Sequence, residues 1–239
     1  MDVDTDRPAF LLVHGAWHGA WCWDALRTEL DATGRRSHTV DLPSARPADG
    51  TPSRPVGMRT DAEAIRESLR RIGGPVVVVA HSYGGVPATE AVTGADNVTG
   101  VVYVAGFALD AGESMFTFLG TPVPEDGTGH APPYEDSRRI LFGDVPEAEA
   151  ARAVARLRPQ SVLSFTEPVT EAGWRTVPSA YVVCEHDQAL PPARQHELAR
   201  RADAVHRLPS GHSPFLSMPR RLAALLDRIA DSGLSAPRR

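Results

Sequence analysis

The fold of this chain is decided by the stretch Val76-Val77-Val78-Val79-Ala80-His81-Ser82-Tyr83-Gly84-Gly85. Four consecutive valines without polar alternation are typical of a strand covered on both faces, as in the middle of a parallel sheet. Ala80, Gly84 and Gly85 have little or no side chain, so the backbone can reverse into a helix within a few residues. The stretch predicts a nucleophile elbow with the Ser82 hydroxyl exposed at its tip. A buried strand followed by an ordinary turn is the alternative.

The composition is that of an ordinary α/β domain. The chain has 239 residues, of which 42% are hydrophobic and 23% charged, and we expect one domain over residues 1–239. The net charge of −5 offers no basic surface for nucleic acid. All 25 basic residues are arginines. The absence of lysine excludes Schiff-base chemistry, including that of pyridoxal phosphate.

The sequence contains no motif for a metal or a nucleotide. CxxC, HExxH and GxxxxGK patterns are absent, and Cys22 and Cys184 are expected to be reduced thiols. The first six residues are acidic where a signal peptide would be basic, and no apolar run approaches membrane-spanning length. We therefore expect a cytoplasmic protein that needs neither metal nor membrane. The oligomeric state is left open.

A second glycine-containing loop precedes the valine strand. Residues 10–13 are a short apolar run, and Gly15 and Ala16 follow at its carboxyl end, where open α/β sheets bind their ligands. The backbone N–H of Ala16 is predicted to form half of an oxyanion hole, and the N–H of Tyr83 the other half. A plain strand-to-helix turn is the alternative. Trp17, nearest the tip of this loop, is a candidate substrate contact, whereas His14 and His18 are expected to hold the loop in place.

Strands and helices alternate along most of the chain, which favours a parallel sheet. Strands are expected over residues 10–13, 37–40, 76–80, 101–107, 180–184 and 205–208. Helices are expected between them, one of them with a capping box that begins at Thr60.

Residues 108–178 differ from the rest, because no clear buried strand occurs there. Helices are expected over 136–142 and 146–157, the second with Asp144 as N-cap. An insertion of this size would lie above the carboxyl edge of the sheet as a cap over Ser82. Its apolar residues, among them Phe118, Leu163 and Phe165, would then line a substrate pocket. The alternative is that they form the cap's own core.

The last third of the chain supplies two further candidate catalytic residues. The strand over 180–184 is followed by Glu185 and Asp187, and a Gly-His-Ser-Pro loop containing His212 follows the last strand. We choose Asp187 as the catalytic acid over Glu185, and over Asp41 and Asp110, which also follow strands. The order Ser82, Asp187, His212 is the order of α/β-hydrolases and not that of chymotrypsin or subtilisin.

The motifs resemble those of the α/β-hydrolase superfamily, within it the group of hydroxynitrile lyases, plant methylesterases and bacterial esterase-like members. The matching segments are residues 10–21, 80–85, 181–187 and 211–215, which together span nearly the whole chain. The resemblance implies an α/β-hydrolase fold: a parallel sheet of about six strands, helices on both faces, and a mainly helical cap before the last two strands. It also implies that no cofactor is needed.

Two departures distinguish between activities within that group. Hydroxynitrile lyases have a threonine at the position of Gly15 and a lysine directly after the catalytic histidine, where this chain has Ser213. The expected function is therefore that of a carboxylesterase, which cleaves a small or medium apolar ester through an acyl-enzyme on Ser82. The alternatives are a lyase or a natural-product cyclisation or tailoring enzyme, and a receptor-like binding protein. A serine nucleophile disfavours dehalogenase and epoxide hydrolase chemistry, for which that superfamily uses aspartate.

Overall fold

Six parallel strands form the central sheet of the computed structural model, which describes residues 7–45, 56–124 and 129–234. The strand order is β2-β1-β3-β4-β7-β8. The strands are β1 (Ala9–Val13), β2 (Ser37–Val40), β3 (Val76–His81), β4 (Val98–Val104), β7 (Ser179–Cys184) and β8 (Ala204–Leu208). The valine run lies in β3, which pairs with β1 and β4 and is buried throughout. The predicted parallel sheet is confirmed, because every pairing in it is parallel. The valines are covered on both faces, as their pattern requires.

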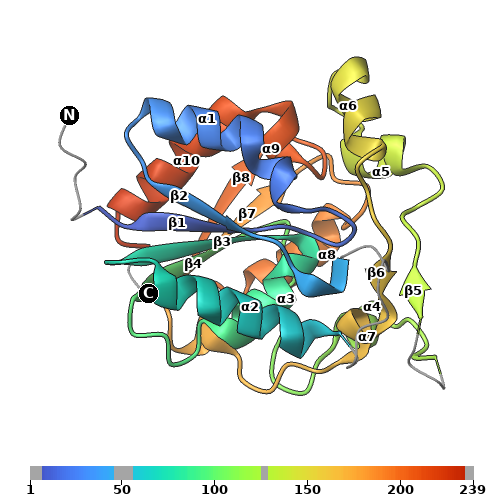
Figure 1. Cartoon of the computed structure of the whole chain (residues 1–239), viewed down its shortest axis with the longest axis horizontal. Coiled ribbons are helices and arrows are strands. Elements are labelled where there is room, and N and C mark those ends of the chain that lie inside the picture. Colours follow the sequence, from blue (N-terminus) through green and yellow to red (C-terminus); the bar gives the residue numbers. More distant parts are fainter. Residues whose placement is uncertain (1–6, 46–55, 125–128, 235–239) are drawn as a thin grey trace.

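Helices cover both faces of this sheet (Figure 1). Alternate residues of β1 face opposite ways, so that Phe10 and Leu12 meet one layer of helices and Leu11 and Val13 meet the other. The first layer contains α1 (Asp24–Ala32), α9 (Pro214–Ser217) and α10 (Pro219–Asp231). The second contains α2 (Met58–Arg71), α3 (Gly85–Ala91) and α8 (Pro192–Ala199). Short 3₁₀ helices are η1 (Ala20–Trp23), η2 (Pro43–Ala45), η3 (Ser82–Gly84) and η4 (Gly173–Arg175).

The reversal from β3 into α3 depends on two glycines. A Cβ on Gly84 would lie 2.4 Å from the carbonyl oxygen of His14, and a Cβ on Gly85 would lie 2.7 Å from the backbone nitrogen of Phe107. Neither distance is compatible with a side chain. The elbow can therefore pack against the loop after β1 and the segment after β4 only because these positions lack a Cβ.

The insertion over residues 108–178 lies between β4 and β7 and is mainly helical. Its described elements are α4 (Met115–Leu119), α5 (Ser137–Phe142), α6 (Glu147–Val154), α7 (Val162–Thr166), the 3₁₀ helix η4, and the short antiparallel pair β5 (His130–Ala131) and β6 (Gln160–Ser161). All four helices lie on the right in Figure 1, α5 and α6 toward the top and α4 and α7 toward the bottom. Within the described residues, no helix combines the length and apolar composition needed to cross a bilayer.

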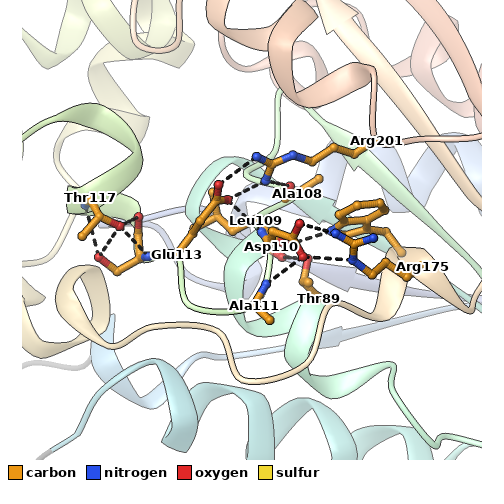
Figure 2. Close-up of polar contacts among 12 residues, drawn as sticks. Thr89, Ala108, Leu109, Asp110, Ala111, Glu113, Thr117, Arg175 and Arg201 are labelled. Carbon is orange, nitrogen blue, oxygen red and sulfur yellow. Dashed lines mark hydrogen bonds and ion pairs between the residues drawn. The ribbon is translucent and has the colours of Figure 1, made fainter.

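Ion pairs fasten the two ends of the insertion (Figure 2). Arg201, just beyond α8, pairs with Glu113 at 2.6 Å and donates a hydrogen bond to the carbonyl of Ala108 at 2.9 Å. Asp110 pairs with Arg175 at the far end of the insertion. The first and last residues of the insertion are thus held together beside the sheet.

Two expected helix caps are wrong. Helix α2 begins at Met58, before Thr60, and the Thr60 hydroxyl accepts a hydrogen bond from the N–H of Gly57. Asp144 does not cap α6. Its carboxylate instead accepts a hydrogen bond at 2.7 Å from the N–H of Gly211, in the loop before His212. Thr60 therefore occupies the third position of α2 instead of its N-cap, whereas Asp144 binds a residue far from its own helix.

Candidate active site

Ser82 occupies the turn directly after β3 in a strained conformation. Its φ is +51°, in the left-handed region, where a residue other than glycine costs about 1–2 kcal/mol. The carbonyl of Ser82 accepts a hydrogen bond at 3.0 Å from the N–H of Phe107, which helps to hold the turn. Ser82 is partly exposed, whereas His81 and Tyr83 on either side are buried. The backbone thus presents the serine hydroxyl outward from a rigid strand end.

His212 and Asp187 meet in a buried hydrogen bond. Nδ1 of His212 lies 2.7 Å from Oδ2 of Asp187, and both side chains are almost completely buried. The carboxylate also accepts bonds from the N–H groups of Ala189 and Leu190, at 2.8 and 2.9 Å, and from Nε2 of Gln195 at 3.0 Å. A carboxylate with this many donors is an acceptor toward His212. In a neutral imidazole, this bond places the proton on Nδ1 and the free lone pair on Nε2.

His81 ties the elbow to the loop that contains His212. Its Nε2 lies 2.9 Å from the carbonyl oxygen of His212, and the two rings are 4.6 Å apart between centroids. Burial lowers the pKa of His81 well below its ordinary value, so the ring is neutral and donates from Nε2. Ser82 follows His81 directly in the chain. The Ser82 hydroxyl has no hydrogen-bond partner among the described residues.

The loop after β1 lies directly against the elbow. A Cβ on Gly15 would be 3.0 Å from Cβ of Ser82 and 2.8 Å from Nδ1 of His81. The next residue, Ala16, has a backbone N–H without a partner in the described part of the chain. Its carbonyl accepts a hydrogen bond from Nδ1 of His18 at 2.7 Å. Nε2 of His14 accepts a hydrogen bond at 3.0 Å from the N–H of Leu42, and its Nδ1 lies 2.8 Å from the carbonyl oxygen of Gly15 in the same loop. Both histidines therefore hold the loop, as expected.

The competing carboxylates are engaged elsewhere. Asp41 accepts a hydrogen bond at 2.8 Å from the N–H of Ala20. Asp110 pairs with Arg175, and Glu185 lies 3.8 Å from Arg207. Among the four carboxylates considered, only Asp187 contacts His212.

The four expected pocket residues are not all neighbours. The rings of Trp17 and Phe165 are 6.0 Å apart, and Phe165 also packs edge-on against Tyr83 at 5.6 Å. Phe118 instead packs against Phe107 at 6.0 Å. Leu163, in α7, packs against the start of α2, where a Cβ on Gly57 would be 2.8 Å from its Cγ.

Sequence reasoning missed several polar and aromatic residues around this site. Tyr134 packs against Trp17 with the centroids 4.9 Å apart. Gln195 binds Asp187, and Asp61 and Gln160 lie in a buried hydrogen-bond chain described below. Single Gln and Asp residues carry no local signal of such roles. For Asp61 and Gln195, only a polar residue on a buried helix face could have indicated them, and Gln160 lies in the two-residue strand β6.

Metal and thiol chemistry find no site in the described residues. Within 7–45, 56–124 and 129–234, no group of three His, Cys, Asp or Glu side chains is arranged to hold a metal ion. Cys22 and Cys184 are free and buried, and burial raises the pKa of both thiols. Such thiols are poor nucleophiles at neutral pH.

The sequence matches the model of a known family over residues 10–225, described as "Alpha/beta hydrolase family". This chain belongs to the alpha/beta hydrolase family. The match covers every strand of the sheet except the first residue of β1, and it includes Ser82, Asp187 and His212.

Several known proteins resemble this chain over nearly its full length. A pyrethroid hydrolase from Sphingobium wenxiniae is 29% identical, with 93% of this chain and 87% of the relative covered. Methylesterase 4 from Arabidopsis thaliana is 29% identical, with 95% and 97% covered. The crystal structure of the methylesterase MES16 from Arabidopsis superposes with a TM-score of 0.79 at 26% identity, covering 94% of this chain and 99% of that one. This hydrolase is thus similar to enzymes named as esterases and hydrolases.

Proposed function

We propose that this hydrolase is a serine carboxylesterase that acts on small or medium apolar esters. The observation that carries the proposal is the buried Asp187–His212 hydrogen bond beside a serine in a strained, outward-facing turn. The similarity to a pyrethroid hydrolase and to methylesterases supports ester hydrolysis as the reaction.

In the proposed mechanism, Nε2 of His212 removes the proton of the Ser82 hydroxyl as its oxygen attacks the ester carbonyl. The backbone N–H groups of Ala16 and Tyr83 hold the resulting oxyanion. The imidazolium, stabilised by Asp187, then protonates the departing alkoxide, which leaves as the alcohol. Water attacks the acyl-enzyme while His212 takes its proton. The carboxylic acid leaves, and the serine hydroxyl is restored.

We further propose that residues 108–178 act as a cap over this site. Two hydrogen bonds support this role, since the N–H of Trp17 donates to Gln160 at 3.1 Å and the carbonyl of Trp17 accepts from the N–H of Arg158 at 2.9 Å. Both partners belong to the insertion. Trp17 and Phe165 would supply apolar walls for the acyl or alcohol group, with Phe118 and Leu163 farther along the same insertion.

A structural argument disfavours cyanohydrin cleavage. The related lyases have threonine where this chain has Gly15, and here any Cβ at that position would press on His81 and Ser82. The threonine of those lyases would therefore fit here only if the loop or the elbow moved.

The test is turnover of p-nitrophenyl esters of increasing acyl length by the wild type and by Ser82→Ala. Ser217→Ala is the matched control, because the Ser217 hydroxyl has no partner in the described residues and lies in α9. We expect the Ser82 variant to lose turnover and labelling by a fluorophosphonate, and the control to keep both. Comparable turnover by Ser82→Ala would remove the proposal.

A further inference from the structure

A chain of buried hydrogen bonds beneath the elbow plays no part in the mechanism above. The phenol of Tyr83 donates to Oδ2 of Asp61 at 2.6 Å, and the hydroxyl of Ser44 donates to the same oxygen. Nε2 of Gln160 donates to Oγ of Ser44 at 2.5 Å, while Oε1 of Gln160 accepts from the N–H of Trp17. The chain thus runs from the elbow through α2, η2 and β6 to the loop after β1.

The members of this chain are buried, yet their polar groups are paired. Asp61, Tyr83 and Gln160 are 0% exposed, and Ser44 is 1% exposed. The Asp61 carboxylate also accepts from the N–H of Ser44 at 2.9 Å. The second hydrogen of the Gln160 amide goes to Oγ of Ser164 at 2.9 Å. Apolar residues could fill the same space without the cost of desolvating a carboxylate, so packing alone does not account for these side chains.

We propose that Gln160 and Asp61 are positioning residues that hold the two halves of the oxyanion hole, an inference that rests on the proposed function. Gln160 sets the backbone of the Ala16–Trp17 loop, and Asp61 sets Tyr83. Ser44 joins the two, so the N–H groups of Ala16 and Tyr83 are placed by one connected structure.

Trp17 shows why its loop needs external support. Its φ is +64°, a conformation that an isolated tryptophan disfavours. The insertion holds it through both backbone groups, with Gln160 on the N–H and Arg158 on the carbonyl, and the indole N–H donates to the carbonyl of Ala131 at 3.1 Å. The N–H of Ala16 lies one peptide earlier. Its direction therefore depends on the orientation that Gln160 imposes on the Ala16–Trp17 peptide.

Tyr83 is fixed at the opposite end of this series of hydrogen bonds. Its N–H is at the start of η3, where the first N–H groups of a helix have no partner within the helix. Its side chain is held by the bond to Asp61 and by edge-on packing against Phe165, which also contacts Trp17. Movement of this ring would carry the neighbouring backbone of Ser82 with it.

The experiment uses Gln160→Met and Tyr83→Phe, which remove the hydrogen bonds and keep the approximate shape. Tyr103→Phe is the matched control, because Tyr103 is equally buried. Its hydroxyl makes a hydrogen bond at 2.8 Å with that of Thr89, which is not part of the series from Tyr83 to Trp17. Loss of an oxyanion donor lowers kcat by about 100–1000-fold. Displacing such a donor should lower kcat by about 10-fold and leave KM within about 2-fold of the wild-type value. The rate of fluorophosphonate labelling should fall in parallel. The control should lose stability but not kcat.

Equal kcat in Gln160→Met and wild type, or an equal loss in Tyr103→Phe, would overturn the proposal. The crystal structure of Gln160→Met provides a second measurement, in which the φ of Trp17 should leave the left-handed region. An unchanged Trp17 would also overturn the proposal, whether or not the protein hydrolyses the esters tried. If the wild type hydrolysed no ester and bound no phosphonate, the proposed function would fail, and the Trp17 conformation would still decide whether Gln160 holds the loop.

Discussion

Gln195 donates a hydrogen bond to the same oxygen of Asp187 that lies 2.7 Å from Nδ1 of His212. The Gln195 amide also donates to the carbonyl of Leu190 at 2.7 Å, and its oxygen accepts from the N–H of Cys184 at 2.8 Å. A single buried side chain of α8 therefore links the end of β7 to the proposed catalytic acid. The orientation of that acid is set by its surroundings as well as by His212.

Replacement of Gln195 by leucine should lower both stability and activity. Leucine leaves the buried N–H of Cys184 and the carbonyl of Leu190 without a partner, which costs about 1–3 kcal/mol per group. Asp187 also loses a donor, so we expect kcat to fall about 10-fold with little change in KM. Urea unfolding and ester turnover measure the two effects. Retention of full kcat in Gln195→Leu would contradict the positioning role, and Gln188→Leu, at an exposed site, provides the comparison.

Replacement of Asp187 by asparagine should nearly abolish turnover. Asparagine can present its amide N–H to Nδ1 of His212, which favours the wrong tautomer, and the loss of kcat in a comparable triad is about 10⁴-fold. Asp41→Asn and Asp110→Asn should keep most of the activity, because these carboxylates bind Ala20 and Arg175. The measurement is kcat for one p-nitrophenyl ester across the three variants. A larger loss in either control would reassign the acid.

A side chain at position 15 should disrupt the site. Gly15→Thr places a Cβ within 2.8 Å of Nδ1 of His81 and 3.0 Å of Cβ of Ser82, so the elbow or the loop must move. Overpacking of this kind costs about 1–3 kcal/mol. We expect loss of esterase activity without gain of cyanohydrin cleavage, assayed as release of p-nitrophenol and of cyanide. Gly73→Thr is the control, since a Cβ there meets nothing within 4 Å.

The stability of the protein should depend on the ionisation of Asp61. Burial raises the pKa of this carboxyl from 3.8 to about 7, so the folded state binds the proton more tightly than the unfolded chain does. The free energy of unfolding should therefore fall as the pH rises from about 4 to about 7, by at most about 4 kcal/mol, and level off above that range. Asp61→Asn lacks this titration.

The measurement is urea unfolding of wild type and Asp61→Asn at about pH 5 and about pH 8. The wild type should lose stability relative to the variant between these two values. If the difference in the free energy of unfolding between the two proteins did not change with pH, Asp61 would be ionised in the folded protein at both pH values.

Local patterns in the sequence were enough to predict the sheet and the elbow. The four valines before Ser82 require cover on both faces, and the glycines after it permit the tight turn, so both features follow from neighbouring residues. The order Ser82, Asp187, His212 also needed no structure, because each residue follows a recognisable strand. These predictions depend on periodicity and turn chemistry, which act over a few residues.

Only the tertiary structure decided which groups are partners. The sequence favoured Asp187 over Asp41, Asp110 and Glu185, which also follow strands, but only the fold shows its contact with His212. The same is true of Gln160 and Trp17, which are 143 positions apart, and of Asp144, which binds the loop before His212 in place of capping its own helix. A polar side chain satisfies whichever buried donor or acceptor lies nearest in space. That choice leaves no periodic trace in the sequence, whereas burial of the valine strand does.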